Sequence, residues 1–306
     1  MSSLPASRHG PSSRHARGRD PQRTAGFRPQ AYRDDGESLR NDREGVRNER
    51  ESFRSNGGEN ARRGRPALIA VAHGSRDPRS AATISAVVAD IAVRRPDLDV
   101  RPAFLDLNTP SVEQVVDAVA AQGHTDAVVV PLLLGSAFHA RVDLPGLLAT
   151  AGVRHPRLRL TQADVLGTDP RLVTALRDRI VAAGADPRDE RTGIAVAAVG
   201  SSSAAANRRT TRIGDLLAAG TAWRTTVCFA TTEPGPAEAV SSLRDRGCDR
   251  VLVAPWFLAP GLLTDRLRTA AADLRHAETI GAHPLLAEVA LDRYAAAITP
   301  TLDLSA

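Results

Sequence analysis

The stretch Leu68-Ile69-Ala70-Val71-Ala72-His73-Gly74-Ser75-Arg76 decides the fold, because an apolar run ends there abruptly on a histidine and a glycine. Small and β-branched apolar residues bounded by turn-forming residues predict a buried parallel strand. Ligands of open α/β sheets bind beyond the carboxyl ends of such strands. The sequence therefore predicts that His73 lies at a functional edge of a sheet.

Strand and helix patterns alternate outward from this stretch. We expect strands over 67–72, 99–105, 126–134 and 158–163, and helices over 78–94, 110–122, 143–150 and 169–183. The second of these helices is expected to begin with Thr109 as its cap and Pro110 as its first residue. This alternation predicts right-handed crossovers and an α/β fold built on a parallel sheet.

The pattern then starts again at an offset of about 125 residues. Residues 194–201 have the character of 69–75, Phe229 and Pro234 repeat Phe104 and Pro110, and 247–255 repeats 123–131. Landmarks that recur in the same order indicate a tandem duplication. We therefore predict two similar α/β domains over 66–184 and 193–306, joined by a linker over 185–192 and facing across a cleft. Each domain is expected to be a parallel sheet flanked by helices.

The first 65 residues differ from the rest in composition. They hold 15 arginines against 9 acidic residues, whereas the remainder has 25 arginines and 26 acidic residues. Because apolar periodicity is nearly absent from 1–65, we interpret this segment as a disordered Arg-rich extension. An RNA-binding arm is the alternative, although we expect no nucleic-acid partner.

Two further patterns bear on location. No apolar run reaches the ~20 residues that a membrane span needs, so we expect no membrane association. The two cysteines, Cys228 and Cys248, form no CxxC pair and are compatible with a reducing cytoplasm. The sequence therefore predicts a cytoplasmic protein.

The two repeats differ in chemistry. His73 corresponds to Val199, and the loop that carries His139 corresponds to a shorter loop over 259–265 without histidine. Asp106 follows the second strand on the same edge and corresponds to Thr231. His73, His139 and Asp106 are thus candidate ligands of one divalent metal, because imidazole suits Fe, Co, Ni and Zn. In the alternative interpretation, each histidine is a loop residue satisfied by backbone hydrogen bonds.

Three arginines, Arg76, Arg79 and Arg141, flank this candidate metal site in the sequence. Arginine suits bidentate capture of carboxylates, although solvated surface charge is an equally good interpretation of any one of them. Ser75 has no Asp-His partner or GxSxG turn, so we interpret Gly74-Ser75 as a turn that offers backbone donors.

At these residues the chain resembles the sirohydrochlorin chelatase family, the small class II tetrapyrrole chelatases. Its matching segments are His73-Gly74-Ser75-Arg76, Phe104-Leu105-Asp106 followed by Pro110-Ser111, and Val130-Pro131-Leu132-Leu133-Leu134 leading to His139 and Asp143-Leu144-Pro145. The resemblance runs from Ala67 to about Ile298. It implies two chelatase-like domains and a lyase that inserts Fe²⁺ or Co²⁺ into sirohydrochlorin, a carboxylate-rich tetrapyrrole, in sirohaem or cobalamin biosynthesis.

The resemblance also implies roles for single residues. The family's metal-binding and catalytic histidines fall on His73 and His139, and its glutamate corresponds to the shorter Asp106. Substrate contacts are implied for Ser75, Arg76, Arg141 and Phe138, with Trp256 as a further candidate for the cleft wall. No permanently bound cofactor is implied, because Fe²⁺, Co²⁺ or Ni²⁺ is itself a substrate. The second domain becomes a lid, in which Val199 is expected to serve stability more than chemistry.

Other functions stay open at the level of sequence. A metal or tetrapyrrole carrier would use the same residues without turnover. A metal-dependent hydrolase is a second alternative, although no further acidic cluster supplies a two-metal site. Neither the physiological metal nor the oligomeric state follows from the sequence.

Overall fold

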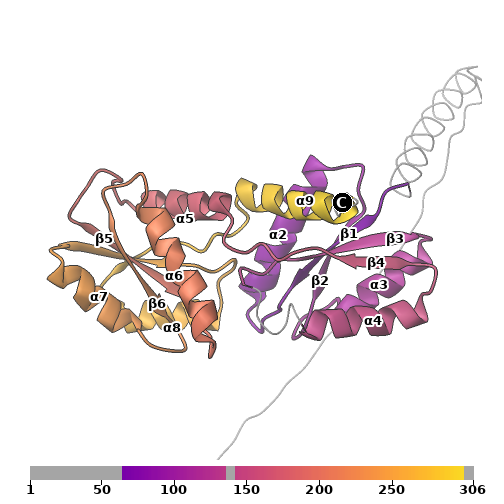
Figure 1. Cartoon of the computed structure of the whole chain (residues 1–306), viewed down its shortest axis with the longest axis horizontal. Coiled ribbons are helices and arrows are strands. Elements are labelled where there is room, and N and C mark those ends of the chain that lie inside the picture. The colour runs from indigo at the N-terminus through magenta and orange to yellow at the C-terminus, as the bar shows by residue number, and fades with distance from the viewer. Residues whose placement is uncertain (1–63, 136–141, 300–306) are drawn as a thin grey trace, which may run out of the picture. The chain divides into compact units, whose positions relative to one another are not determined.

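Two parallel sheets follow one another along the chain in the computed structural model, which describes residues 64–135 and 142–299 (Figure 1). The first sheet has the strand order β2-β1-β3-β4. Its strands are β1 (Ala67–Ala72), β2 (Val100–Phe104), β3 (Asp126–Pro131) and β4 (Arg159–Gln162). The helices between them are α2 (Pro78–Arg94), α3 (Val112–Ala121) and α4 (Leu144–Arg154).

The second sheet repeats this arrangement with the order β6-β5-β7-β8. Its strands are β5 (Thr192–Ala198), β6 (Arg224–Phe229), β7 (Arg250–Pro255) and the short β8 (Arg275–His276). The intervening helices are α6 (Ala204–Ala218), α7 (Pro236–Asp245) and α8 (Leu262–Ala270). All pairings in both sheets are parallel, so the expected fold class, α/β with two tandem repeats, is confirmed.

Hydrogen bonds at the strand ends confirm the duplication residue by residue. Leu105 N donates to Ala72 O in the first half, and Ala230 N donates to Ala198 O in the second. Leu132 N donates to Val71 O, and Trp256 N donates in the same way to Ala197 O. The two halves therefore end their central strands in the same backbone geometry, which makes their loops directly comparable.

Two helices cross to the other half: α5 (Pro170–Ala182) packs against α6 and β7 of the second half, and α9 (Pro284–Ile298) packs against α2 and β3 of the first. The two helices also pack against each other. Arg177 on α5 donates to the carbonyl oxygen of Ala219 beyond α6, at 2.8 Å. Tyr294 on α9 donates through its hydroxyl to Pro66 O, just before β1, at 2.7 Å. The units that pack together therefore differ from the sequence repeats 66–184 and 193–306. Helix α5 of the first repeat packs with the second half, and helix α9 of the second repeat packs with the first half. Sequence order suggested that each helix packs within its own repeat. The apolar face of a helix shows that it is buried, but not which sheet covers it.

The central strands are buried along their whole length. Every residue of β1 and β5 is buried, as expected for strands covered on both faces. One apolar cluster includes residues from both sheets and from α2, α5, α6 and α9. This shared core joins the two halves into one compact unit. None of the described helices is long and apolar enough to cross a membrane.

Element boundaries differ locally from the expectation at α3. This helix begins at Val112 and is capped by Ser111, whose hydroxyl accepts from Gln114 N while the Gln114 side chain accepts from Ser111 N. Thr109 and Pro110 precede the helix, so their expected roles as cap and first residue are wrong. The reciprocal capping of Ser111 and Gln114 satisfies two amide donors that a helix N-terminus leaves open.

Candidate functional site

His73 is the first residue after β1, the strand that lies between β2 and β3. Its side chain is exposed at the carboxyl end of the sheet. The ring atom Nδ1 lies 3.4 Å from the carbonyl oxygen of Gly74. In the tautomer whose Nδ1–H points at this oxygen, Nε2 carries the lone pair that a metal ligand needs.

Asp106 lies beside His73, as the sequence predicts from its position after the neighbouring strand. The amide of Asp106 donates to the carbonyl oxygen of His73 at 3.0 Å. The Asp106 carboxylate is exposed, and its Oδ1 accepts from the amide of Leu107 at 2.7 Å. Leu107 adopts a positive φ of 63°, which is uncommon for a residue with a branched side chain. The turn at Leu107 therefore directs its amide to the Asp106 carboxylate.

Gly74 allows the His73 loop to approach the Asp106 loop. Its φ is +98°, and a Cβ built on it would lie 1.8 Å from the carbonyl oxygen of Asp106. The next amide, Ser75 N, donates to Asn108 Oδ1 at 2.6 Å. Asn108 is a functional candidate that the sequence analysis missed, and its only signal was a polar side chain two residues beyond Asp106. The two loops that carry His73 and Asp106 are thus fixed to each other.

Ser75 takes part in the turn that leads into α2. Its hydroxyl oxygen accepts from Asp77 N at 3.1 Å, and Asp77 in turn caps α2 by accepting from Arg79 N at 2.9 Å. A side-chain hydrogen bond from Arg79 lowers the pKa of Asp77 below its usual value. The expected turn at Gly74-Ser75 is present. The Ser75 amide, expected as a backbone donor, donates its hydrogen bond to Asn108 Oδ1.

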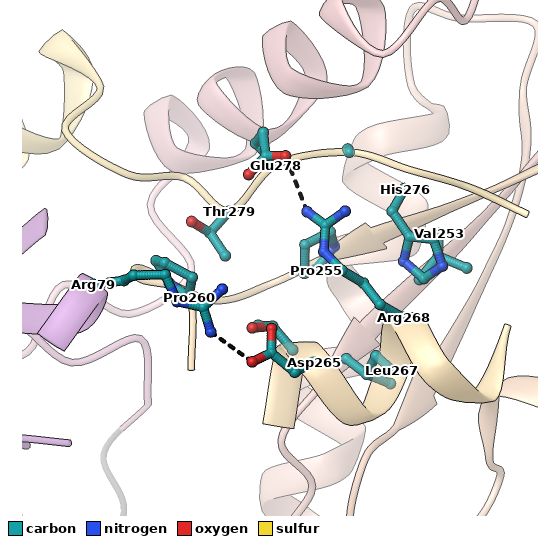
Figure 2. A pocket seen from close by; sticks show the side chains of 12 residues that line it. Arg79, Val253, Pro255, Pro260, Asp265, Leu267, Arg268, His276, Glu278 and Thr279 are labelled. Atoms are coloured by element: carbon teal, nitrogen blue, oxygen red, sulfur yellow. Dashed lines mark hydrogen bonds and ion pairs between the residues drawn. The ribbon is translucent and has the colours of Figure 1, made fainter. Parts of the chain in front are cut away.

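The flanking arginines behave differently. Arg76 is exposed, and among the described residues no hydrogen bond or ion pair is assigned to it. Arg79 bonds Asp77 through Nε at 3.0 Å and reaches Asp265 of the second half through Nη2 at 2.5 Å. Figure 2 shows this second contact at one end of α8. Arg76 is therefore the better placed of the two to meet a carboxylate from solvent.

Three predicted site residues, Phe138, His139 and Arg141, lie outside the described residues. Trp256, expected as a further wall residue, is only 4 % exposed and belongs to the core. Trp256 corresponds to Leu132, the buried residue that directly follows β3 in the first half, because their amides make equivalent backbone hydrogen bonds. The expectation for Trp256 is wrong because the first residue after β7 points into the core.

A cavity of about 290 Å³ lies under Arg79, between α8 and the ends of β7 and β8 (Figure 2). Several of its polar lining groups are paired with each other or with the backbone. Arg268 donates to Glu278 at 2.9 Å, and His276 Nε2 lies 2.9 Å from Ala271 O. This cavity is separate from the exposed side chains of His73 and Asp106, so the candidate chemistry lies at an open edge.

The remaining histidines of the described chain have partners away from His73. His124 and His155 contact the carboxylates of Asp99 and Asp117 at 3.1 and 2.6 Å, in loops that precede strands. His283 contacts Asp178 at 3.3 Å and caps α9. The described residues contain no group of three or more His, Cys, Asp or Glu side chains placed to hold a metal. Any metal bound by His73 and Asp106 therefore takes further ligands from water or from residues outside this part of the chain.

The second half keeps the loop geometry without these side chains. Thr231 N donates to Val199 O at 3.0 Å, which is the counterpart of the bond between Asp106 and His73. Gly200 has a φ of +92° and lies against Thr231 and Thr232, as Gly74 lies against Asp106. The predicted equivalences of His73 with Val199 and of Asp106 with Thr231 are confirmed. One half of the molecule thus presents an imidazole and a carboxylate where the other presents a valine and a threonine.

Paired α/β halves, each with a parallel sheet, place the chain in a class of two-part α/β proteins, and ligands of such sheets bind beyond the carboxyl ends of the strands. Within this class, the sequence profile of the CbiX family matches residues 67–183 and 193–297. The chain belongs to the CbiX family.

Known proteins similar to the chain agree with this assignment. A sirohydrochlorin ferrochelatase of Priestia megaterium is 30 % identical over 207 residues, covering 66 % of the chain and 76 % of the relative. A sirohydrochlorin cobaltochelatase of the same organism is 28 % identical, covering 65 % and 66 %. Among solved structures, SirB from Bacillus subtilis with Fe³⁺ has a TM-score of 0.64 and 26 % identity, covering 76 % of the chain and 94 % of SirB.

Proposed function

We propose that this protein is a metal chelatase that inserts Fe²⁺ or Co²⁺ into sirohydrochlorin. The observation that carries the proposal is the pair His73 and Asp106, joined by a backbone hydrogen bond at the carboxyl end of a parallel sheet. The activities named for its relatives, ferrochelatase and cobaltochelatase, agree with this chemistry. Synthesis of sirohaem or of cobalamin would consume the product.

The metal ion is a substrate in this proposal and must be released during the reaction. Two or three protein ligands hold an ion less firmly than a closed set of four, because the remaining positions stay with exchangeable water. His73 and Asp106 are exposed, so water and substrate can both reach them. We assign His139 as a further ligand from the sequence. Ni²⁺ is a third candidate metal, and no permanently bound cofactor takes part.

Insertion also moves protons. Two pyrrole N–H protons must leave the ring as the metal binds its four nitrogens. Imidazole accepts protons near neutral pH, so His73 and His139 can each take up one of these two protons once the ion has passed to the ring. The Asp106 carboxylate beside His73 stabilises the resulting imidazolium. Arg76 pairs with carboxylates at the edge of the macrocycle, and Arg141, Phe138 and Ser75 complete the substrate contacts.

The proposal places the reaction in the cytoplasm. Cys228 and Cys248 are free and buried, and burial raises the pKa of the Cys228 thiol to about 12. Free thiols persist in a reducing compartment, which also keeps iron as Fe²⁺. We infer no membrane or nucleic-acid partner.

Anaerobic absorbance spectroscopy tests the function directly. The purified protein is incubated with sirohydrochlorin and Fe²⁺, Co²⁺ or Ni²⁺, beside a blank with metal alone. We expect the tetrapyrrole bands to shift faster than in the blank, and expect His73→Ala to slow this shift by about 100-fold or more. His155→Ala is the matched control, because His155 pairs with Asp117 in a loop that precedes β4.

The outcomes separate the proposal from its alternative. Bound tetrapyrrole without acceleration would make the protein a carrier. Full activity in both His73→Ala and His139→Ala would show that neither histidine takes part in metal insertion. Because His73 is exposed, we expect its substitution to change the free energy of unfolding by less than about 0.5 kcal/mol.

A further inference from the structure

Two aliphatic side chains are exposed on the loops of the second half that correspond to the site loops of the first. Val199, directly after β5, is 44 % exposed, and Leu262, the first residue of α8, is 64 % exposed. Both follow the carboxyl ends of strands in the second sheet. A single exposed aliphatic side chain is normal on a protein surface. Two at the same edge of a sheet, on the loops that correspond to the site loops of the first half, need an explanation.

The polar groups of these loops are turned toward their own backbone. Thr231 Oγ1 donates to Val199 O at 2.7 Å. Thr264 Oγ1 donates to Gly261 O at 2.7 Å and accepts from Gly261 N at 2.9 Å. Ser201 Oγ accepts from Ser203 N at 3.1 Å. These three hydroxyls are satisfied locally, whereas the side chains of Val199 and Leu262 are exposed at the same edge.

The loop before Leu262 meets the His73 loop of the first half. A Cβ built on Gly261 would lie 3.6 Å from Ser75 Oγ, which is ordinary van der Waals contact. A few residues further along, Asp265 accepts from Arg79 at 2.5 Å. The apolar edge of the second half and the polar edge of the first are therefore joined at this point.

We propose that Val199 and Leu262 form an apolar seat for one face of the tetrapyrrole, while His73 and Asp106 present the metal to its other face. This inference rests on the proposed function. Sirohydrochlorin carries its carboxylates at the perimeter, and the centre of each ring face is apolar. Removing that face from water on aliphatic side chains favours binding. A seat on one side also explains why only one half needs a histidine at this position, since the metal enters from one face.

The test uses Val199→Ser and Leu262→Ser in the full chain, with metal-free sirohydrochlorin titrated under anaerobic conditions. We expect each substitution to raise the Kd for the tetrapyrrole about ten-fold, the order expected for burial of one aliphatic side chain. KM should rise in parallel while kcat at saturating substrate stays unchanged. Cobalt binding in the absence of tetrapyrrole, measured by calorimetry, should also stay unchanged.

Matched controls come from exposed aliphatic residues on helices. Val153 on α4 is 84 % exposed and Leu216 on α6 is 41 % exposed, so Val153→Ser and Leu216→Ser remove similar side chains elsewhere. We expect both controls to bind the tetrapyrrole with the Kd of the unmodified protein.

Three results would overturn the seat. If the unmodified protein binds the tetrapyrrole and both variants bind it equally well, the seat is wrong while the chelatase function stands. A fall in kcat at unchanged Kd would place these residues in the chemical step. If the unmodified protein fails to bind sirohydrochlorin, the seat and the proposed function fail together.

Discussion

The amide of Asp106 donates to the carbonyl oxygen of His73 at 3.0 Å, which fixes the ends of β1 and β2 side by side. This bond directly follows the bond from Leu105 N to Ala72 O at the end of the two strands. It places an imidazole and a carboxylate on adjacent loops without using either side chain. Both side chains are exposed at the sheet edge. The loop glycine and the amide that support them can be tested separately.

Gly74→Ala should be much more destabilising than Gly123→Ala. Both glycines have positive φ, +98° and +82°, so alanine is strained at each by about 1 kcal/mol. Only Gly74 faces a close neighbour, since its added Cβ would lie 1.8 Å from Asp106 O, whereas nothing lies within 4 Å of that on Gly123. We expect a loss of more than about 3 kcal/mol for Gly74→Ala in urea unfolding. Equal losses for the two variants would contradict the close approach of the loops.

Asn108→Ala should slow metal insertion more than it lowers stability. The substitution removes the acceptor of Ser75 N, two residues from His73, and should lower the free energy of unfolding by about 1 kcal/mol. Displacement of His73 should lower kcat about ten-fold. Asn108→Asp keeps an acceptor and should restore most of the rate.

The second half supplies a control for this residue. Asn207 donates through Nδ2 to Ser201 O at 2.8 Å in the loop that follows β5. Asn207→Ala should cost similar stability while the insertion rate is kept. An unchanged kcat in Asn108→Ala would mean that this hydrogen bond does not position His73.

Arg76→Gln should raise KM for the carboxylate-rich substrate more than Arg79→Gln does. Arg79 is already paired with Asp77 and Asp265, whereas Arg76 extends into solvent. A guanidinium that pairs with a substrate carboxylate contributes a salt-dependent interaction, so the effect of Arg76→Gln should shrink at high ionic strength. Steady-state kinetics at two salt concentrations measure it. A larger KM effect for Arg79→Gln would assign the substrate contact to Arg79.

Asp169 should make stability depend on pH in the acid range. Burial alone would raise the pKa of Asp169, but hydrogen bonds from Arg171 and the charge of Arg293 outweigh it and leave the pKa below its usual value. A lowered pKa in the folded state stabilises the protein above the unfolded pKa of about 4, and this contribution is lost as pH falls through the folded value. Asp169→Asn should therefore cost about 2 kcal/mol at pH 7 and progressively less below pH 4.

Asp292→Asn is the control for this pH effect, because Asp292 is 60 % exposed and contacts only one of these arginines, Arg171, at 2.6 Å. We expect it to change the free energy of unfolding by less than about 1 kcal/mol at either pH. A constant difference between Asp169→Asn and the unmodified protein from pH 7 to pH 3 would contradict the linkage.

The sequence by itself determined the strands, the duplication and the residues that end each central strand. These features are local or repeated, so apolar periodicity reveals them directly: β1 and α2 have the expected bounds. Equivalence of His73 with Val199 followed from the register of two similar runs. His73 and Asp106 were recognisable as neighbours because parallel strands end at the same edge.

Only the tertiary structure decided which surfaces meet. Three features join residues far apart in the chain: the exchange of α5 and α9, the hydrogen bond from Ser75 N to Asn108 Oδ1, and the pairing of Arg79 with Asp265. An amphipathic pattern shows that a face is buried, but it does not identify the partner. Trp256 illustrates the same limit: it was expected in the wall of the cleft, and the direction of the chain after β7 places it in the core.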